Sequence, residues 1–510
     1  MKKGLFLSLI FAVALIGSVP AQQITYSDPD RDDLRNTNYE IIGKLNDNFL
    51  VYKNYRDVHY IAVYDQDMKM TAKQRIDNIP DRIFNADFLA YPDFFYMFYQ
   101  FQKRNVVYCM AQKIGPDGKN MGDPVQLDTT NLAFAASNKI YTVLNSEDKQ
   151  KILVFKINSK NDKLHYVTTV EFDKDMQLLH RSVFGVNMPE RNDFLTEFQV
   201  DNDGDIAFVR AWGTAQNDNI TRLSLLTKPL MSDVATETDL RITNLYLDDV
   251  RLKVDNANKH YLITSFYSKQ RRGNIEGLYS YMWDKNSAMQ MFAGNTIFSD
   301  ELRAEAKGEN SVKGAFNDYF LQNIIMRKDG GFLIAAESVY TSSRGSNLSR
   351  WDYLYGSPFL SPYNYYYGSG FGWGGYYYPW YRYGYGGYGN ITRYYADDIA
   401  VLSFGNDGKM EWSNIIQKSQ YDDNSDNFIG YGLINTGDQL HFFFNVPEKR
   451  QQIFSEQNIS PDGQLTRVPT LKNLDRGYDF MPRQAKQTGL RQFIVPVQYR
   501  TYTCFAKVEL

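Results

Sequence analysis

The chain of 510 residues has a formal charge of −3, 43% hydrophobic residues and only two cysteines. This length exceeds what one ordinary core holds, so it predicts either several domains or one large repeat architecture. The near-neutral charge disfavours a nucleic-acid-binding protein, which would need a basic face. We therefore expect no nucleic-acid partner.

The first 21 residues have the features of a secretory signal. Lys2 and Lys3 precede an apolar run at residues 5–16, and small residues lead up to a cleavage position after Ala21. The apolar run is shorter than the roughly 20 residues that span a bilayer, and no later segment is apolar enough to do so. We expect residues 1–21 to be a signal peptide. The protein would be secreted, to the periplasm or to an outer-membrane-associated position.

The two cysteines, Cys109 and Cys504, lie towards opposite ends of the chain. In an oxidising compartment a bond between them would tie the two ends together. Two buried, unpaired thiols are the other interpretation, and the sequence leaves both open.

Short runs rich in Val, Ile, Phe and Tyr alternate with tight turns of Asp or Asn with Gly. Such turns favour hairpins because their central residues must take positive φ. One kind of turn is expected between the outer strands of a unit, at residues 61–70, 112–121, 170–179, 402–412 and 458–468. A second kind is expected between inner strands, at residues 198–209, 252–263, 324–336 and 433–444.

Units of roughly 40 to 55 residues with about four strands each are typical of a β-propeller. We predict an all-β fold at residues 22–510, a single propeller of about eight four-stranded blades. Seven blades are the main alternative, and a pair of β-sandwiches or barrels is the competing architecture. Blades are expected to begin near Tyr39, Ala86, Leu132, Leu195, Leu245, Phe316 and Phe428. Three strands from Phe480 to Leu510 would combine with Gln23 to Ser27, so that both chain ends close the ring in one blade.

These units resemble those of exported bacterial β-propeller proteins over nearly all of the chain after the signal. The resemblance is architectural, because the paired Gly-His and Trp-Asp signatures of WD40 proteins are missing, as are regularly spaced kelch double glycines. It implies the fold and assigns no functional residue.

Residues 352–389 form a low-complexity tract of Tyr, Gly, Pro and Trp, with Asp352 and Arg382 as its only charged residues. Glycine at this density raises the entropy cost of ordering the backbone, while the aromatic rings would gain by leaving water. We predict a disordered surface insertion inside the sixth blade, between its inner and outer strands.

The aromatic side chains of the tract suit several kinds of contact. They can anchor a protein interface, stack on sugar rings or settle among membrane headgroups, or the tract can lack a specific role. We expect contact with an envelope protein, with glycan binding and peripheral membrane contact as alternatives. The residues expected to make the contact are Tyr365, Tyr366, Tyr367, Trp373, Tyr376, Tyr377, Tyr378, Trp380, Tyr383 and Tyr385.

Catalytic signatures are sparse. The five histidines are scattered and none forms a metal-ligand pair, so each is expected on a strand surface. No G-x-S-x-G nucleophile motif, phosphate-binding loop or sialidase aspartate box is present. We predict a binding or scaffold protein, not an enzyme, and no cofactor. The alternative is a glycan-binding or glycan-hydrolysing propeller.

One acidic run deserves comparison with a calcium loop. Asp201, Asp203 and Asp205 alternate as its first ligands do, but Trp212 stands where the final bidentate Glu belongs. The pattern favours a turn, and it leaves the three aspartates as candidate Ca²⁺ ligands.

Overall fold

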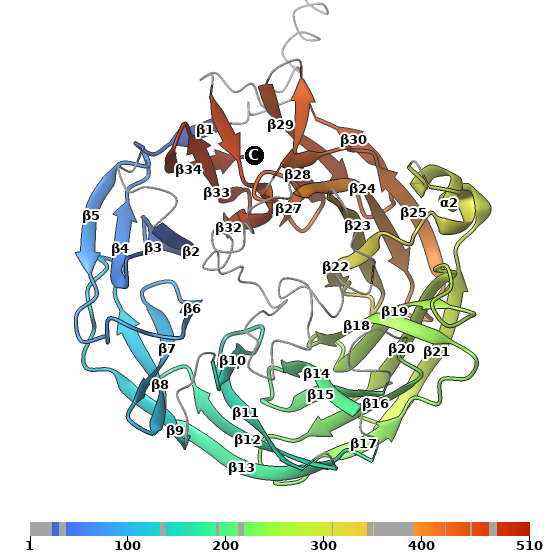
Figure 1. Ribbon diagram of the computed structural model, residues 1–510, viewed down its shortest axis with the longest axis horizontal. Helices are drawn as coiled ribbons and strands as arrows, with labels where there is room; N and C mark the ends of the chain where they lie inside the picture. Colours follow the sequence, from blue (N-terminus) through green and yellow to red (C-terminus); the bar gives the residue numbers. More distant parts are fainter. Residues whose placement is uncertain are drawn as a thin grey trace, which may run out of the picture.

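The computed structural model describes residues 23–29, 37–132, 139–161, 163–189, 193–212, 219–308, 310–343, 350, 392–423, 425–448, 451–468 and 477–510. Its strands form eight antiparallel sheets that follow one another around a ring (Figure 1). The predicted eight-bladed propeller is therefore confirmed, against seven blades and against paired sandwiches.

Seven blades are built from consecutive strands, running from the centre of the ring outwards. Blades one to three consist of β2 (Thr37–Leu45), β3 (Asn48–Tyr55), β4 (Val58–Tyr64) and β5 (Met70–Arg75); β6 (Asn85–Ala90), β7 (Phe95–Lys103), β8 (Val106–Ile114) and β9 (Val125–Asn131); and β10 (Thr142–Asn145), β11 (Lys151–Asn161), β12 (Leu164–Asp173) and β13 (Leu178–Asn187). Blades four and five consist of β14 (Asp193–Val200), β15 (Ile206–Trp212), β16 (Arg222–Lys228) and β17 (Thr236–Asp239); and β18 (Tyr246–Asp255), β19 (His260–Ser268), β20 (Gly277–Asp284) and β21 (Met289–Ile297).

Blades six and seven follow the same order. They consist of β22 (Tyr319–Met326), β23 (Phe332–Ser343), β24 (Thr392–Phe404) and β25 (Met410–Ile416), with β26 (Tyr421–Asp423) also paired to β24; and β27 (Tyr431–Asn435), β28 (Leu440–Glu448), β29 (Gln451–Ile459) and β30 (Leu465–Arg467). The described helical segments are α2 (Asp300–Ala306) and two 3₁₀ turns, η2 (Val312–Gly314) and η5 (Pro482–Gln484).

The eighth blade joins the two ends of the chain, as predicted. β31 (Tyr478–Phe480) and β32 (Lys486–Gly489) both pair with β33 (Gln492–Tyr499), which pairs with β34 (Tyr502–Glu509). β1 (Gln23–Tyr26) then pairs with β34 as the outermost strand.

The predicted turns also lie where expected. The first kind joins the third strand of a blade to the fourth, and the second kind joins the first strand to the second. In most of them the fourth residue takes positive φ, as Gly118 (φ 77°) and Gly204 (φ 90°) illustrate. One predicted boundary was wrong: the third blade begins at Thr142, not near Leu132, because Leu132 directly follows β9, the last strand of the second blade. We call the end of the ring that carries both kinds of turn the turn face, and the opposite end, where inner strands begin and second strands lead to third strands, the loop face.

Hydrophobic side chains pack between blades and not within one central core. The described residues form eight buried clusters, each between two successive blades. The cluster between blades eight and one contains Phe505 and Phe49, both fully buried. Cys109 and Cys504 are buried in blades two and eight and no disulfide joins them, and burial raises the pKa of Cys109.

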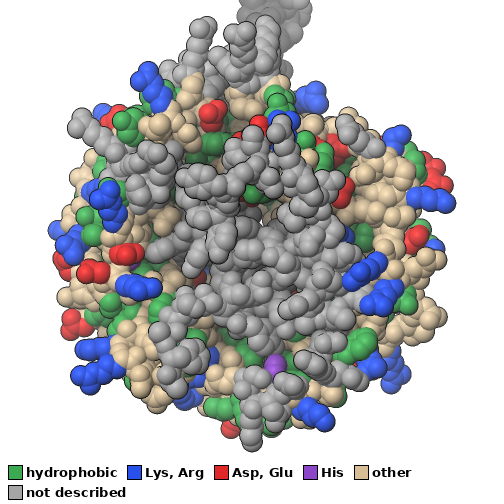
Figure 2. Space-filling model, viewed as in Figure 1, with side chains coloured by type: hydrophobic (Ala, Val, Ile, Leu, Met, Phe, Trp, Pro, Cys, Tyr) green, Lys and Arg blue, Asp and Glu red, His purple; other side chains and the backbone are tan. Residues whose placement is uncertain are grey.

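On the face shown in Figure 2, basic and acidic side chains are interspersed around the rim. None of the helices among the described residues has the length and apolar character needed to cross a membrane.

The closure of the ring can be tested at Tyr26, whose ring stacks on Tyr478 with centroids 4.4 Å apart. Replacing Tyr26 by alanine should lower the free energy of unfolding by about 1 to 2 kcal/mol, because stacking and apolar burial are both lost. Tyr502→Ala in the same blade is the control, since Tyr502 is 38% exposed. Urea denaturation measures both, and equal effects would contradict a closing role for β1.

Candidate functional site at the loop face of blades five and six

The aromatic tract enters and leaves the sixth blade at the loop face. β23 ends at Ser343 and β24 begins at Thr392, and these two residues pair directly across the strands. The insertion therefore interrupts the blade between its second and third strands, as predicted. The ten aromatic residues expected to make contacts lie outside the described residues, as do residues 1–21.

Arg350, two positions before the tract, is held by a buried ion pair. Its guanidinium donates to both carboxylate oxygens of Asp248, from Nε at 2.9 Å and from Nη2 at 2.8 Å. Nη1 donates to the carbonyl oxygens of Asn317, at 3.2 Å, and Tyr319. The guanidinium also lies over the ring of Phe320, 4.4 Å from its centroid. Bidentate pairing and stacking fix an arginine in position and orientation, so this residue anchors the chain at the start of the tract.

Asp248, the partner of Arg350, lies at the edge of a bulge in β18. The pairing of β18 with β19 shifts register between Asp248 and Arg251, and Asp249 within the bulge takes a left-handed φ of 46°. The Asp249 carboxylate then accepts a hydrogen bond from the backbone N–H of Leu321 in blade six, at 2.6 Å. Arg251 pairs with the same carboxylate at 2.7 Å.

The preceding blade repeats this device. Glu197, in the bulge of β14, has a φ of 56°, and its carboxylate accepts a hydrogen bond from Leu252 N–H of blade five at 3.2 Å. In two successive blades, a strained inner-strand residue thus reaches the backbone of the next blade. Strain of this kind persists only where surrounding contacts stabilise it.

Burial dominates the electrostatics of this site. It raises the pKa of Asp248, although Arg350 acts in the opposite direction. It also raises the pKa of Glu197, against the effect of Arg251. Each of these carboxylates already has an arginine or a backbone N–H as partner. The arrangement is suited to holding a chain segment in place.

A second buried cluster continues the site towards blade eight. Glu337 pairs in register with Phe320. Its carboxylate forms ion pairs with Lys418 Nζ at 2.9 Å and with Arg483 Nη2 at 2.8 Å. Burial opposes ionisation of Glu337, but Lys418 and Arg483 outweigh it and lower its pKa. Gly430 leaves the space that the Arg483 side chain occupies, since a Cβ there would lie 2.0 Å from Arg483 Nε. No pattern in the sequence indicates this cluster, whose members come from blade six, the segment after it and η5.

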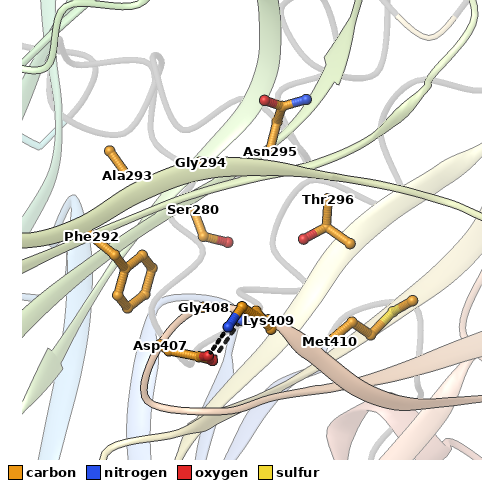
Figure 3. Close-up of a pocket in the computed structure, with 10 residues that line it drawn as sticks. All are labelled: Ser280, Phe292, Ala293, Gly294, Asn295, Thr296, Asp407, Gly408, Lys409 and Met410. Carbon is orange, nitrogen blue, oxygen red and sulfur yellow. Dashed lines mark hydrogen bonds and ion pairs between the residues drawn. The ribbon is translucent and has the colours of Figure 1, made fainter.

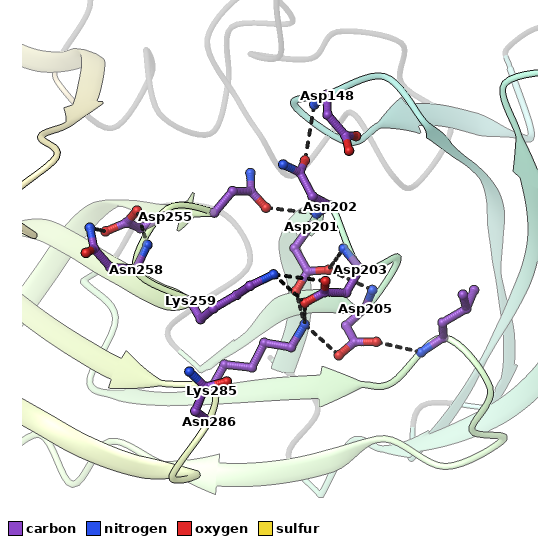
Figure 4. Close-up of polar contacts among 12 residues, drawn as sticks. Asp148, Asp201, Asn202, Asp203, Asp205, Asp255, Asn258, Lys259, Lys285 and Asn286 are labelled. Atoms are coloured by element: carbon purple, nitrogen blue, oxygen red, sulfur yellow. Dashed lines mark hydrogen bonds and ion pairs between the residues drawn. The ribbon is translucent and has the colours of Figure 1, made fainter.

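The acidic run at residues 201–205 lies on the turn face, and its partner is a lysine (Figure 4). Lys285 Nζ lies 2.6 Å from Asp201, 2.8 Å from Asp203 and 2.8 Å from Asp205. Lys259 also binds Asp203, and together the two lysines lower the pKa of Asp203 to about 2. Among the residues that the structure describes, no group of three His, Cys, Asp or Glu side chains is placed to hold a metal ion.

The same run ties three blades together. The backbone N–H of Asp148 in blade three donates to the Asn202 side chain at 3.1 Å. The backbone N–H of Asn202 donates to Asn256 of blade five at 2.8 Å. The contacts drawn in Figure 4 therefore form an interblade network around an ammonium group.

The expectation that every histidine lies on a strand surface was wrong. His59, His165 and His441 are buried, at 3%, 9% and 8% exposure. The period-two pattern does not show which side of a blade a neighbour covers, and in a propeller both sides are covered.

His441 sits between a hydroxyl and a carboxylate. Its Nε2 lies 3.0 Å from Thr436 Oγ1, and its Nδ1 lies 2.7 Å from Glu456. Thr436 Oγ1 also donates to Asp438 at 2.6 Å, which is the contact that closes its turn. Ser146 forms the same Ser/Thr-x-Asp turn, in which its hydroxyl donates to Asp148. The hydrogen bonds described for this hydroxyl include none to a histidine, so the turn forms without one. Turn geometry therefore accounts for the position of Thr436.

Comparison with known proteins supplies no family. No protein-family model matches the chain, and no curated protein does. Among solved structures it is similar to the polysaccharide lyase Uly1, with 8% identity and a TM-score of 0.39 over 83% of this chain and 89% of that one. It is also similar to prolyl oligopeptidase B from Galerina marginata, with 9% identity and a TM-score of 0.39 over 91% and 56%. Oligopeptidase B from Leishmania major has 8% identity and a TM-score of 0.37 over 92% of this chain and 54% of that one. This chain therefore spans about half the length of the two oligopeptidases. The assignment as a propeller rests on the strand order described above.

The anchor can be tested by removing Arg350. Arg350→Ala leaves the buried Asp248 carboxylate without its ion pair, so the free energy of unfolding should fall by about 3 to 5 kcal/mol near neutral pH. Arg350 acts to lower the pKa of Asp248, so without it burial raises that pKa further in the folded variant. The carboxyl then takes up a proton as the pH falls, and the loss should be smaller at about pH 5 than at about pH 7.

Arg393→Gln is the matched control for this experiment. Arg393 and its partner Asp423 are each 43% exposed, and we expect no measurable change in stability. Urea denaturation at both pH values measures the effects. A pH-independent loss in Arg350→Ala would contradict the buried pairing.

The lysine-centred network predicts how the protein responds to calcium. Millimolar Ca²⁺ should leave the melting temperature unchanged, because Lys285 Nζ already occupies the position among the three carboxylates that a cation would take. Lys285→Met should lower the melting temperature, since the carboxylates then repel one another. Thermal melts with Ca²⁺, and with Mg²⁺ as the control, measure this; a rise specific to Ca²⁺ in the unmodified protein would restore the calcium interpretation.

Proposed function

We propose that this protein is a non-catalytic, exported β-propeller that acts as a binding or scaffold protein at the bacterial cell envelope. Its main contact surface is the Tyr/Gly-rich tract at residues 352–389 on the loop face. The observation that supports this proposal most directly is the buried pairing of Arg350 with Asp248 immediately before the tract.

An anchored start favours binding for a physical reason. An interface loses affinity when segments must be ordered on binding, and a fixed end reduces that loss. Arg350 attaches the tract to the inner strand of blade five, while Thr392 returns it to blade six. The described residues on either side of the tract, Arg350 and Thr392, are thus held at defined points of a rigid scaffold, and loops held in this way commonly carry binding residues.

The chemistry of the tract indicates the kind of partner. Tyrosine and tryptophan are enriched among the residues that carry most of the binding energy in protein interfaces. With Asp352 and Arg382 as its only charged residues, the tract offers little to a strongly charged partner. A protein of the envelope is the partner we propose, in keeping with the secretory signal at residues 1–21.

The paired carboxylates of the loop face support binding over glycan hydrolysis. A glycan hydrolase needs two carboxyl groups that reach the sugar. Asp248 and Asp249 are instead paired with Arg350 and Arg251, and Glu197 accepts a backbone hydrogen bond. Glycan binding through the aromatic tract is the second candidate, because Tyr and Trp faces also stack on sugars.

The experiment is a pull-down from envelope extracts with two tagged proteins. One is the full chain, and the other has residues 357–388 replaced by a glycine-serine linker of equal length. We expect a partner, identified by mass spectrometry, that the full chain retains and the replacement loses. Circular dichroism should show the same β content in both, because the tract lies between two strands of a complete blade.

Three outcomes would count against the proposal. Loss of β structure in the replacement would show that the tract belongs to the fold. A partner bound equally by both proteins would place the contact elsewhere. Binding to arrayed glycans that depends on the tract would favour the glycan alternative.

A further inference from the structure

The outer strand of blade five, β21, differs from the other outer strands. The outer strands of five blades carry exposed charged residues, at Lys73 and Arg75, Arg181, Glu237 and Asp239, Glu411, and Arg467. In β9 the charged residue, Asp128, is buried and paired with Lys156. β21 has nine residues and no charge, whereas β1, the other uncharged outer strand, has four residues. Exposed charges on edge strands prevent pairing with other chains, so β21 lacks a protection that five blades have.

The edge of β21 is also accessible. The side chains of Met289, Met291 and Ile297 are 64%, 47% and 55% exposed. Among the strands that the structure describes, β21 is the last of its sheet and pairs only with β20. An exposed, uncharged edge strand with apolar side chains is a ready template for another strand.

The register identifies the backbone groups on the free edge. Phe298 N–H donates to Glu276 O at 3.1 Å, and residues of an antiparallel pair alternate between bonded and non-bonded positions. The bonded positions of β21 are therefore Thr296, Gly294 and Phe292, which pair with Leu278, Ser280 and Met282. The N–H and C=O groups of Ala293, Asn295 and Ile297 point outwards, at the spacing that an added strand requires.

A pocket of about 460 Å³ adjoins this edge (Figure 3). Phe292 and Thr296 point towards the 407–410 hairpin of blade six, while Ala293 and Asn295 point away from it. Gly294 and Ser280, which pair in register, form the part of the wall with the smallest side chains. A Cβ added to Gly294 would meet no atom within 4 Å.

We propose that β21 binds an extended, uncharged segment of a partner protein as an added antiparallel strand, with an aromatic side chain of that segment covering Gly294. Main-chain hydrogen bonds supply affinity in this mode, and a pocket for one side chain supplies specificity. An aromatic residue opposite an edge glycine compensates for the missing side chain. The charged groups at the rim, Asp407 and Lys409, neutralise each other at 2.8 Å, which favours an uncharged segment.

A second copy of this chain fits the edge less well. In a two-fold pair, β21 of the copy would lie against β21, and its single aromatic residue is Phe292. That ring already packs on the hairpin, because a Cβ on Gly408 would lie 2.6 Å from it. Phe292 is therefore not free to fill the pocket of a copy. The site is separate from the aromatic tract, so the inference goes beyond the proposed function and can succeed or fail independently of it.

The test removes one outward backbone donor. Asn295→Pro deletes an N–H on the free edge and leaves the bonds to β20 intact, and proline is tolerated on such an edge. Asn295 also donates from its side chain to Tyr267 at 3.0 Å. Asn295→Ala loses that contact but keeps the N–H, so it is the matched control.

The probe is a displayed library of random ten-residue peptides, panned against the full chain and counter-selected on Asn295→Pro. We expect uncharged, alternating peptides with one aromatic residue, whose affinity falls about tenfold or more in Asn295→Pro and stays within about twofold in Asn295→Ala. Gly294→Leu, which fills the pocket, should abolish the preference for the aromatic residue.

The inference is overturned if no peptide distinguishes the full chain from Asn295→Pro, or if both variants bind alike. Light scattering tests whether a second copy of this chain occupies the edge instead. A dimer that Asn295→Pro converts to a monomer would show that the edge pairs with a second copy and not with a partner. Circular dichroism must show equal β content in all variants, and Gly294→Leu gives a second, proline-free readout if Asn295→Pro fails to fold.

Discussion

The structure depends on the pairing of β1 with β34. Each blade buries its apolar faces only against its two neighbours, so the eight clusters between blades require a closed ring. A blade made from both ends of the chain turns closure into a set of backbone hydrogen bonds between Gln23–Tyr26 and Ala506–Glu509. This constraint holds the inner strands at fixed positions, and the loop face inherits its rigidity from them.

Polar contacts then set how neighbouring blades lie relative to one another. Hydrophobic clusters are non-directional, whereas a carboxylate that reaches a specific N–H in the next blade admits one position. Glu197 to Leu252 and Asp249 to Leu321 repeat this contact at the same place in successive inner strands. Lys285 among its three aspartates has a comparable role on the turn face. Buried polar networks of this kind restrict a fold to one packing when every member is satisfied.

The repeat architecture could be predicted from sequence because its signals are local. Asp-Gly turns and strand-length apolar runs specify hairpins, and their spacing specifies blades. The third blade was placed too early because Leu132 begins an apolar run, residues 132–136, directly after the last strand of the second blade. The pairing of Arg350 with Asp248 could not be predicted from sequence, because the two residues are separated by 102 positions. The bulge at Asp249 has no signature in the residue types either. The partner of Asp201 could not be predicted either. The acidic run does surround a cation, but that cation is the ammonium group of Lys285, 84 residues away.

The exposed edge of β21 is informative because the other blades show how this protein treats its edges. A propeller places the outer edge of every blade at the surface, so the chain faces the same pairing hazard eight times. Five outer strands carry exposed charge, β9 carries a buried one and β1 is short. Charge on β21 would carry no packing penalty, since its side chains are largely exposed, so folding does not explain why it is missing. A strand that keeps outward backbone groups beside a pocket floored by Gly294, where the rim charges of Asp407 and Lys409 offset each other, meets the physical requirements of strand addition. A binding role accounts for the uncharged strand and the pocket together.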